Sequence, residues 1–264
     1  MVKLVAVLRR RPDMTHAEYL DYIVNVHAKL APPAPAPGSE AAVPAGPPPM
    51  GRYIQNHVFD SAYGATGDDG YQVTMPRDSV TELSFNDVES MRKVFESPFT
   101  RDVVGPDGAN FSDLPAAVSL LVEETRTGRA APSDTDVKVL HFLGAGEGLS
   151  AEEVQERWLR AHQDVLAADP ELAAALRGHE WNTVIPGQGM TGYFGGAELP
   201  EYVAYSALWF DESEALPLFR RYAAGIAEHQ DKHGTFYRPS LSFFLLCREV
   251  VIFDVAQFAA PSED

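Results

Sequence analysis

The sequence contains a single cysteine, Cys247, which stands in the apolar run FFLLCRE. One thiol cannot form an internal disulfide, and a cysteine among apolar residues is typical of a buried position rather than of a nucleophile. We therefore exclude a disulfide framework and set cysteine chemistry aside.

The chain also lacks an excess of positive charge and any apolar run long enough to span a bilayer. Its 264 residues carry a formal net charge of -17, and no basic run is longer than Arg9 to Arg11. Such a protein repels the phosphates of nucleic acids and the surface of anionic membranes. The short apolar run at the N-terminus is not followed by a small-residue cleavage site. We predict a cytoplasmic protein with neither a nucleic-acid nor a membrane partner.

The first half of the sequence alternates between strand and helix patterns. Residues 3–10 are predicted to form a strand, and residues 13–30 place apolar side chains at helical spacing behind a capping box made by Thr15 and Glu18. Prolines and glycines at 31–50 forbid regular structure, so we predict a long loop or lid there.

Two predicted strands, 51–59 and 79–85, follow this loop. A helix at 86–97, capped by Asn86 or Asp87, and a last strand at 116–124 complete the order β-α-β-β-α-β.

The second half repeats this order. Ser150 and Glu153 form another capping box, and three pairs of residues keep a nearly constant spacing. These pairs are Asn56 with Asn182, 126 residues apart, and Phe85 with Phe210 and Phe111 with Phe236, each 125 apart.

The repeat predicts an α+β protein made of two ferredoxin-like (β-α-β-β-α-β) repeats packed sheet to sheet as an α+β barrel, with the helices outside. We place the first repeat at 1–125, a linker at 126–135, the second repeat at 136–255 and a tail at 256–264. Because one chain can close such a barrel, we predict a monomer that imitates a dimer, or a homodimer.

The segments at 4–31, 53–59 and 80–98 together resemble the EthD family of the dimeric α+β barrel superfamily. The likeness extends more loosely over 136–255, so the chain resembles a tandem EthD protein. The resemblance implies a histidine near the end of the first helix that projects into a cleft between sheet and helices. It also implies enzymes of aromatic polyketide pathways, including cofactor-free dehydratases, decarboxylases, cyclases and oxygenases, although the fold alone does not fix the reaction.

His27 and His57 are the two histidines of the first half that we consider as candidate functional residues. His27 ends the first predicted helix, where it either contacts its own helix carbonyls or, as the resemblance implies, faces the cleft. On the strand YIQNHVF, Gln55 and His57 share one face and Asn56 lies on the other. The alternation leaves open which face is turned inward, so either His57 or Asn56 can line the site.

Glu82 stands between apolar residues on a predicted central strand. A buried carboxylate there either pairs with His27 or His57 as an acid-base group or has a raised pKa. The other interpretation is a half-exposed sheet glutamate that faces a helix. Ala207 occupies the matching position of the second half, which predicts that this chemistry survives in one half only.

We predict His27, His57 and Glu82 as catalytic residues. The predicted substrate-binding residues are Tyr53, Gln55, Asn56, Phe85, His162, His179, Trp181, Asn182 and Tyr237. His229 and His233 have the i, i+4 spacing of metal ligands, but the glycine that follows and the lack of an identified third ligand favour solvated histidines.

The predicted function is that of a cofactor-independent lyase or isomerase, which uses histidine-mediated proton transfer on a hydrophobic aromatic or polyketide-like molecule. One alternative is an oxidoreductase of the same superfamily, either cofactor-free or with haem bound by a histidine. Another is a protein that binds small molecules, or an accessory of an oxygenase system, without activity of its own.

Overall fold

The structure is a computed structural model that describes residues 1–31, 50–64, 76–127, 135–185, 193 and 202–254. The proline-rich loop, most of the linker and the C-terminal tail lie outside these residues. Their predicted roles and the predicted domain boundaries therefore remain predictions.

The first half contains the strands and helices in the expected order. They are β1 (Val2–Leu8), α1 (His16–Asn25), the 3-10 turn η1 (His27–Leu30), β2 (Arg52–Tyr63), β3 (Ser79–Phe85), α2 (Val88–Glu96), the π turn η3 (Thr100–Val104), α3 (Gly105–Phe111), the 3-10 turn η4 (Leu114–Ala116) and β4 (Val118–Thr127). The capping box at Thr15 and Glu18 is confirmed, and Asp87 caps α2 by accepting a 2.7 Å hydrogen bond from the backbone of Ser90.

The second half follows the same order with longer helices. Its elements are β5 (Asp136–Ala145), α4 (Ala151–Ala168), α5 (Pro170–Ala175), β6 (Gly178–Val184), β7 (Tyr202–Asp211), α7 (Ala215–His233) and β8 (Tyr237–Asp254). The capping box at Ser150 and Glu153 is confirmed.

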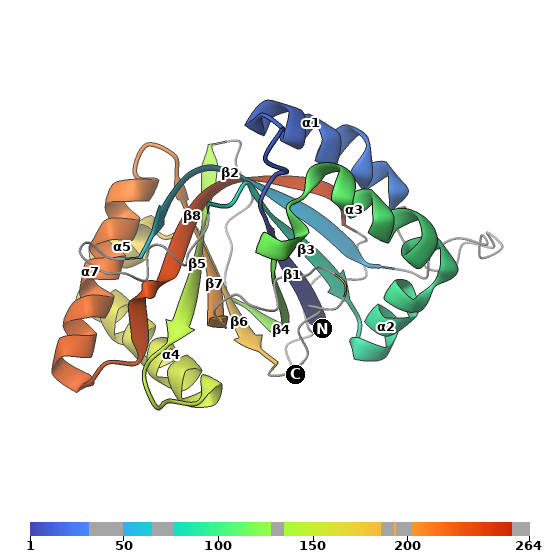
Figure 1. The fold of residues 1–264 in the computed structure, drawn as a ribbon. Helices are drawn as coiled ribbons and strands as arrows, with labels where there is room; N and C mark the ends of the chain where they lie inside the picture. The colour runs from blue at the N-terminus through green and yellow to red at the C-terminus, as the bar shows by residue number, and fades with distance from the viewer. Residues whose placement is uncertain (32–49, 65–75, 128–134, 186–192, 194–201, 255–264) are drawn as a thin grey trace.

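The prediction of two ferredoxin-like repeats packed sheet to sheet is wrong, although the α+β class is correct. The eight strands of the described residues form one closed antiparallel barrel in the order β1-β3-β2-β8-β5-β7-β6-β4 (Figure 1). The halves meet edge to edge, where β2 pairs with β8 and β4 pairs with β6, instead of stacking face on face. Closure pairs the backbone groups that an open sheet leaves at its edges, and this explains why the edges join.

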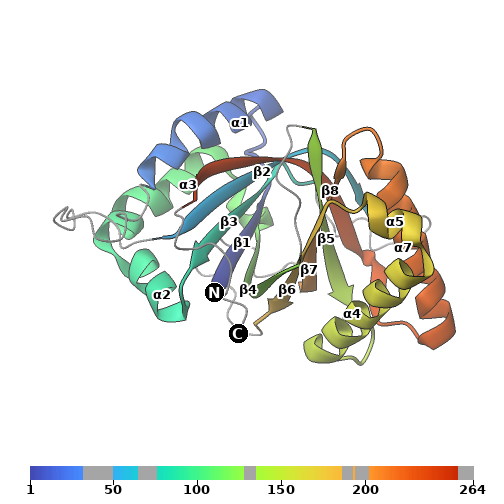
Figure 2. The ribbon, with the colours of Figure 1, turned by 180° about the vertical axis from the view of Figure 1, so that it is seen from behind.

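The helices cover opposite flanks of the barrel. In Figures 1 and 2, α1, α2 and α3 lie on the flank formed by the first half, while α4, α5 and α7 lie on the other. Each strand therefore has one face toward the barrel interior and one toward helices or solvent. No helix among the described residues is both long and apolar enough to cross a membrane.

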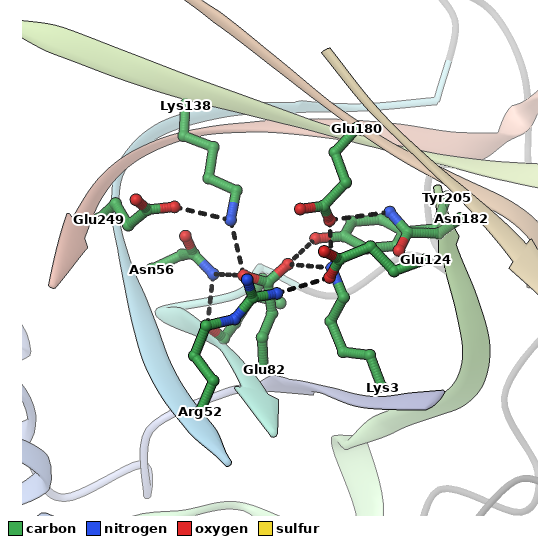
Figure 3. A network of polar contacts seen from close by, with 11 residues as sticks. Lys3, Arg52, Asn56, Glu82, Glu124, Lys138, Glu180, Asn182, Tyr205 and Glu249 are labelled. Carbon is green, nitrogen blue, oxygen red and sulfur yellow. Dashed lines mark hydrogen bonds and ion pairs between the residues drawn. The ribbon is translucent and has the colours of Figure 1, made fainter. Parts of the chain in front are cut away.

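A network of charged side chains fills part of the barrel interior (Figure 3). Lys3 contacts Glu180 and lies 2.8 Å from Glu124, while the Lys138 ammonium lies 2.6 Å from Glu82. These lysine and glutamate side chains are at most 1% exposed. Each lysine thus bonds a glutamate of the other half.

Three further groups complete the network. Arg52 donates a 2.6 Å hydrogen bond to Glu124, the hydroxyl of Tyr205 donates to Glu82, and Glu249 lies 3.0 Å from Lys138. The fully buried members are three cations and three carboxylates, and Glu249, 13% exposed, lies at the rim. Buried charges need this kind of matching, because an unpaired one loses its hydration without compensation.

Glu82 is the anion that joins the two lysines. Burial disfavours its charged form, but attraction by Lys138 and Lys3 outweighs this effect and holds the pKa of Glu82 well below its ordinary value. The carboxylate is therefore ionised and serves as a structural counter-ion.

Replacing Glu82 by Ala is expected to lower the free energy of unfolding by about 3–5 kcal/mol, because two lysine ammoniums would lose a buried partner. Denaturant unfolding followed by tryptophan fluorescence measures this change. Glu123→Ala, an exposed glutamate on β4, is the matched control and is expected to change it by less than about 0.5 kcal/mol. Equal effects of the two substitutions would contradict the structural role of Glu82.

Candidate functional site

An apolar cavity lies between the outer face of β1, β2 and β3 and the helices of the first half. Its apolar lining includes Leu8, Ile23, Met50, Leu83, Phe95 and Phe111. Polar groups reach it at a few points, among them His27, Tyr53, Thr81 and Thr100. A mostly apolar cavity with a few placed polar groups is the usual form of a small-molecule site.

His27 enters the cavity wall because α1 ends before it. The helix stops at Asn25, and the chain tightens into the 3-10 turn that begins at His27. The imidazole ring packs 4.7 Å from the ring of Phe111, and its Nδ1 lies 2.8 Å from the carboxylate of Asp107. His27 therefore binds a carboxylate from another helix instead of the carbonyls of its own.

Asp107 is fixed by three donors. Its Oδ1 accepts hydrogen bonds from the Tyr22 hydroxyl at 2.7 Å and from Asn110 at 2.9 Å, while Oδ2 faces His27. Burial opposes ionisation of Asp107, but these hydrogen bonds outweigh it and lower its pKa. An ionised carboxylate accepts hydrogen bonds only, so the proton of the His27–Asp107 bond resides on Nδ1.

This assignment defines the chemistry that His27 can perform. With Nδ1 protonated, the neutral ring carries its basic lone pair on Nε2. Burial lowers the pKa of His27 below its ordinary value, and Asp107 only partly opposes this effect. His27 is therefore neutral at pH 7 and able to accept a proton, and Asp107 would stabilise the imidazolium that results.

A second set of hydrogen bonds leads to the cavity along the outer face of β2. The side-chain amide of Gln55 donates to the backbone carbonyl of Ile23 and to the Tyr53 hydroxyl, both at 2.8 Å. His57 Nε2 lies 3.2 Å from Gln55 Oε1. Because the Gln55 nitrogen supplies both donors, Tyr53 accepts from Gln55, and its own hydroxyl hydrogen can point elsewhere.

These contacts show which face of β2 is turned toward the barrel interior, which the sequence left open. Gln55 and His57 lie on the outer face of β2 beneath α1, and Asn56 lies in the barrel interior, where it donates to Glu82 at 3.1 Å. Tyr53 lines the cavity, whereas Gln55 and His57 lie behind it.

His57 and Glu82, the other two predicted catalytic residues, are thus separated from His27. Glu82 lies in the interior network, on the opposite face of β3 from Thr81, which lines the cavity. Asn182 also lies in the interior and donates to Glu180. Phe85 is buried at the end of β3 against Phe95, beside the cavity but outside its lining.

Three of the predicted residues of the second half, His162, His179 and Trp181, belong to a packed aromatic cluster. The rings of His162 and His179 lie 4.1 Å apart, those of Trp158 and Trp181 lie 4.2 Å apart, and His162 Nδ1 contacts the Tyr222 hydroxyl at 3.1 Å. Burial lowers the pKa of His162 to about 3 and that of His179 to about 4, so both rings are neutral. The space that corresponds to the cavity is occupied by these side chains.

The remaining histidines and Tyr237 also lie away from the cavity. Tyr237 is buried near His141, with ring centroids 6.2 Å apart. His229 and His233 share one face of α7, with rings 4.4 Å apart. Within the described residues, no group of three or more His, Cys, Asp or Glu side chains is placed to hold a metal ion.

Asp107 and Tyr193 line or support the cavity and were not predicted from the sequence. Asp107 lies in a segment, VVGPDGANF, whose two glycines and proline weaken its helical pattern. Pro106, within the first turn of α3, is the signal that predicts a helix start there. Tyr193 belongs to the β6–β7 connection of the second half, far from the cavity in sequence.

Comparison with known proteins identifies the first half. Residues 11–115 match the EthD domain, which confirms the resemblance for this part of the chain. No curated protein matches the chain.

Solved structures share the whole fold at low sequence identity. An anthrone oxidase-like protein is 10% identical and superposes with a TM-score of 0.52 over 96% of this chain and 94% of its own. A protein of Fusobacterium nucleatum, described provisionally as a monooxygenase, is 7% identical with a TM-score of 0.51 over 95% and 93% of the two chains. At these identities the likeness establishes the fold alone.

Replacing Asp107 by Asn is expected to lower the pKa of His27 further, because the substitution removes the negative charge that favours the imidazolium. Titration of the histidine rings by NMR measures this shift. Asp102→Asn, an exposed aspartate of the same region, is the control and is expected to leave His27 unchanged. A His27 titration that is the same in both variants would show that the His27–Asp107 bond is absent in solution.

Proposed function

We propose that the chain is an enzyme that transfers a proton to and from a hydrophobic aromatic molecule bound in the cavity of the first half. The observation that carries this proposal is His27 in the wall of a mostly apolar cavity, with its Nδ1 bonded to Asp107. A neutral imidazole held by a partly buried carboxylate is the arrangement that a general base requires.

The proposed first step is removal of an acidic hydrogen from a carbon next to a carbonyl or phenol. Nε2 of His27 takes the proton, the electron pair moves to the substrate oxygen, and Asp107 stabilises the imidazolium. The negative charge that develops on the substrate oxygen then needs a hydrogen-bond donor.

Tyr53 is positioned to be that donor. Gln55 donates to the Tyr53 oxygen, so the Tyr53 hydroxyl hydrogen is not used in that bond. Burial raises the pKa of Tyr53 to about 12, which keeps the hydroxyl protonated. In this proposal His57 and Gln55 are positioning residues, because they act on Tyr53 and do not line the cavity.

The cavity favours a neutral aromatic substrate. Its described lining contains no Lys or Arg that could bind a carboxylate or phosphate, and it offers the aromatic faces of Phe95 and Phe111. A polyketide-like ketone or phenol satisfies these conditions.

The fate of the deprotonated substrate defines the reaction class. Return of the proton to another atom, or loss of a leaving group, gives an isomerase or lyase. Reaction of the same carbanion with O2 converts a CH2 group into a carbonyl and releases water, which is cofactor-free oxygenation. The similarity in fold to an anthrone oxidase-like protein supports cofactor-free oxygenation as the second candidate reaction.

Haem fits the cavity poorly. His27 Nε2 is a suitable axial ligand, but haem also needs partners for its two propionates, and the described lining provides no basic residue except His27 itself. We therefore assign no step to haem. The remaining alternative is a protein that only binds the aromatic molecule. An enzyme is distinguished from it if a His27 variant loses turnover but still binds the molecule.

Replacing His27 by Gln is expected to slow exchange of the acidic hydrogens of anthrone with D2O by about 10²- to 10⁴-fold, while anthrone binding changes little. Mass spectrometry measures the exchange, and an oxygen electrode in the same reaction separates oxygenation from simple proton transfer. The wild-type rate is expected to fall as the pH drops through the lowered pKa of His27, because a protonated ring cannot accept a proton.

The matched control for this experiment is His162→Gln, which changes the corresponding residue of the second half. It is expected to retain the wild-type exchange rate if circular dichroism shows the variant to be folded. Equal exchange by wild type and His27→Gln would rule out the proposed base.

Replacing Tyr53 by Phe is expected to slow the same exchange about 100-fold, because it removes the donor to the developing oxyanion. Tyr237→Phe removes a tyrosine hydroxyl outside the cavity and is expected to have no effect. If both variants exchange at the wild-type rate, Tyr53 takes no part in the chemistry.

A further inference from the structure

One wall of the cavity comes from the second half of the chain. Tyr193, in the connection between β6 and β7, lines the cavity together with residues of β1 to β3 and α1 to α3. Its ring packs edge-on against Phe95, with centroids 4.8 Å apart. The two residues are nearly one hundred positions apart in sequence, so this contact depends on barrel closure.

Gly105 allows this close approach. A Cβ atom at this position would lie 3.2 Å from the Tyr193 hydroxyl oxygen and 3.3 Å from Cε2 of its ring. A larger residue at position 105 would therefore press on the ring. The tyrosine is seated between Phe95 and the first residue of α3.

The described residues of the second half form no comparable cavity at the matching place. Trp158, Trp181, His162 and His179 fill the space between its strands and helices. The offset of 125 residues that relates Phe111 to Phe236 also pairs Asp107 with Lys232, an exposed lysine bonded to Glu228. At this place the described part of the second half thus offers neither the space nor the carboxylate that the first half has.

We propose that the second half is a non-catalytic partner whose Tyr193 determines which aromatic substrates the first half accepts. This inference rests on the proposed function, because it takes the cavity as the substrate site. Tyr193 closes one side of the cavity with an aromatic ring beside Phe95. A fused-ring substrate would contact this ring, and the position of Tyr193 limits how many fused rings can enter.

The experiment compares ligand binding by wild type, Tyr193→Ala and Tyr193→Phe. The probes are 2-naphthol, anthrone and 5,12-naphthacenequinone, with two, three and four fused rings, and fluorescence quenching or calorimetry gives their affinities. Tyr193→Ala is expected to weaken binding of the three-ring probe by about 5- to 10-fold, because an aromatic contact is lost. It is expected at the same time to shift the preference toward the four-ring probe.

The phenylalanine variant is the matched control, since it keeps the ring and is expected to keep the wild-type order of affinities. Gly105→Ala leaves Tyr193 itself unchanged but places a methyl group against its ring. This variant is also expected to change the order of affinities. Identical affinities for all probes in wild type and Tyr193→Ala would overturn the inference. Binding of no probe by the wild type would overturn it too, together with the proposed aromatic substrate.

Failure of this inference about Tyr193 can be distinguished from failure of the proposed function. Binding is measured without turnover, so the preference can shift in Tyr193→Ala even if His27→Gln exchanges hydrogens at the wild-type rate. In that case the role of Tyr193 in specificity stands, and the assignment of His27 as the base is wrong. If the exchange depends on His27 but Tyr193→Ala leaves all affinities unchanged, the function stands and the role of the second half is wrong.

Discussion

Edge pairing between the two halves is the constraint on which the remaining structure depends. Because β2 bonds to β8 and β4 bonds to β6, the strands close on themselves and create an interior that neither half has alone. Across the two seams Lys3 bonds Glu180 and Lys138 bonds Glu82, in addition to the glutamates that each lysine contacts in its own half. The same closure brings Tyr193 of the second half against Phe95 of the first.

The two halves share an order of elements but differ in how their helices end. In the first half, α1 stops at Asn25, and a π turn precedes α3, so space remains over the sheet and Asp107 can approach His27. In the second half, α4 and α7 run for 18 and 19 residues, and the tryptophan of α4 packs into the corresponding space. A difference in helix continuity therefore leaves a cavity in the first half and a packed core in the second.

Local patterns predicted much of this fold from the sequence. The capping residues Thr15 and Ser150 and the internal repeat each follow from residue type and spacing, and the EthD match extends over the first half. The stacking of two sheets was wrong because both stacking and edge pairing bury the same apolar faces. Periodicity along a strand does not say which strand lies beside it.

The site was predictable only in part, for similar reasons. His27 follows from its place after the helix, but its carboxylate partner lies 80 residues away on a short helix with a weak pattern. Glu82 was paired with the wrong groups because alternation on β3 gives two faces without saying which one looks into the barrel. Tyr193 carries no local signal at all, since its role arises from the other half of the chain.

The reciprocal pairing of Lys3 with Glu180 and of Lys138 with Glu82 has an evolutionary consequence. Because part of each lysine's neutralisation comes from the opposite half, each half supplies counter-ions that the other requires. A duplicated gene that has acquired such pairing cannot easily return to identical subunits, because its intermediates would hold unmatched charges in their interior. Fusion of the halves is therefore hard to reverse, because each half supplies counter-ions for the buried charges of the other.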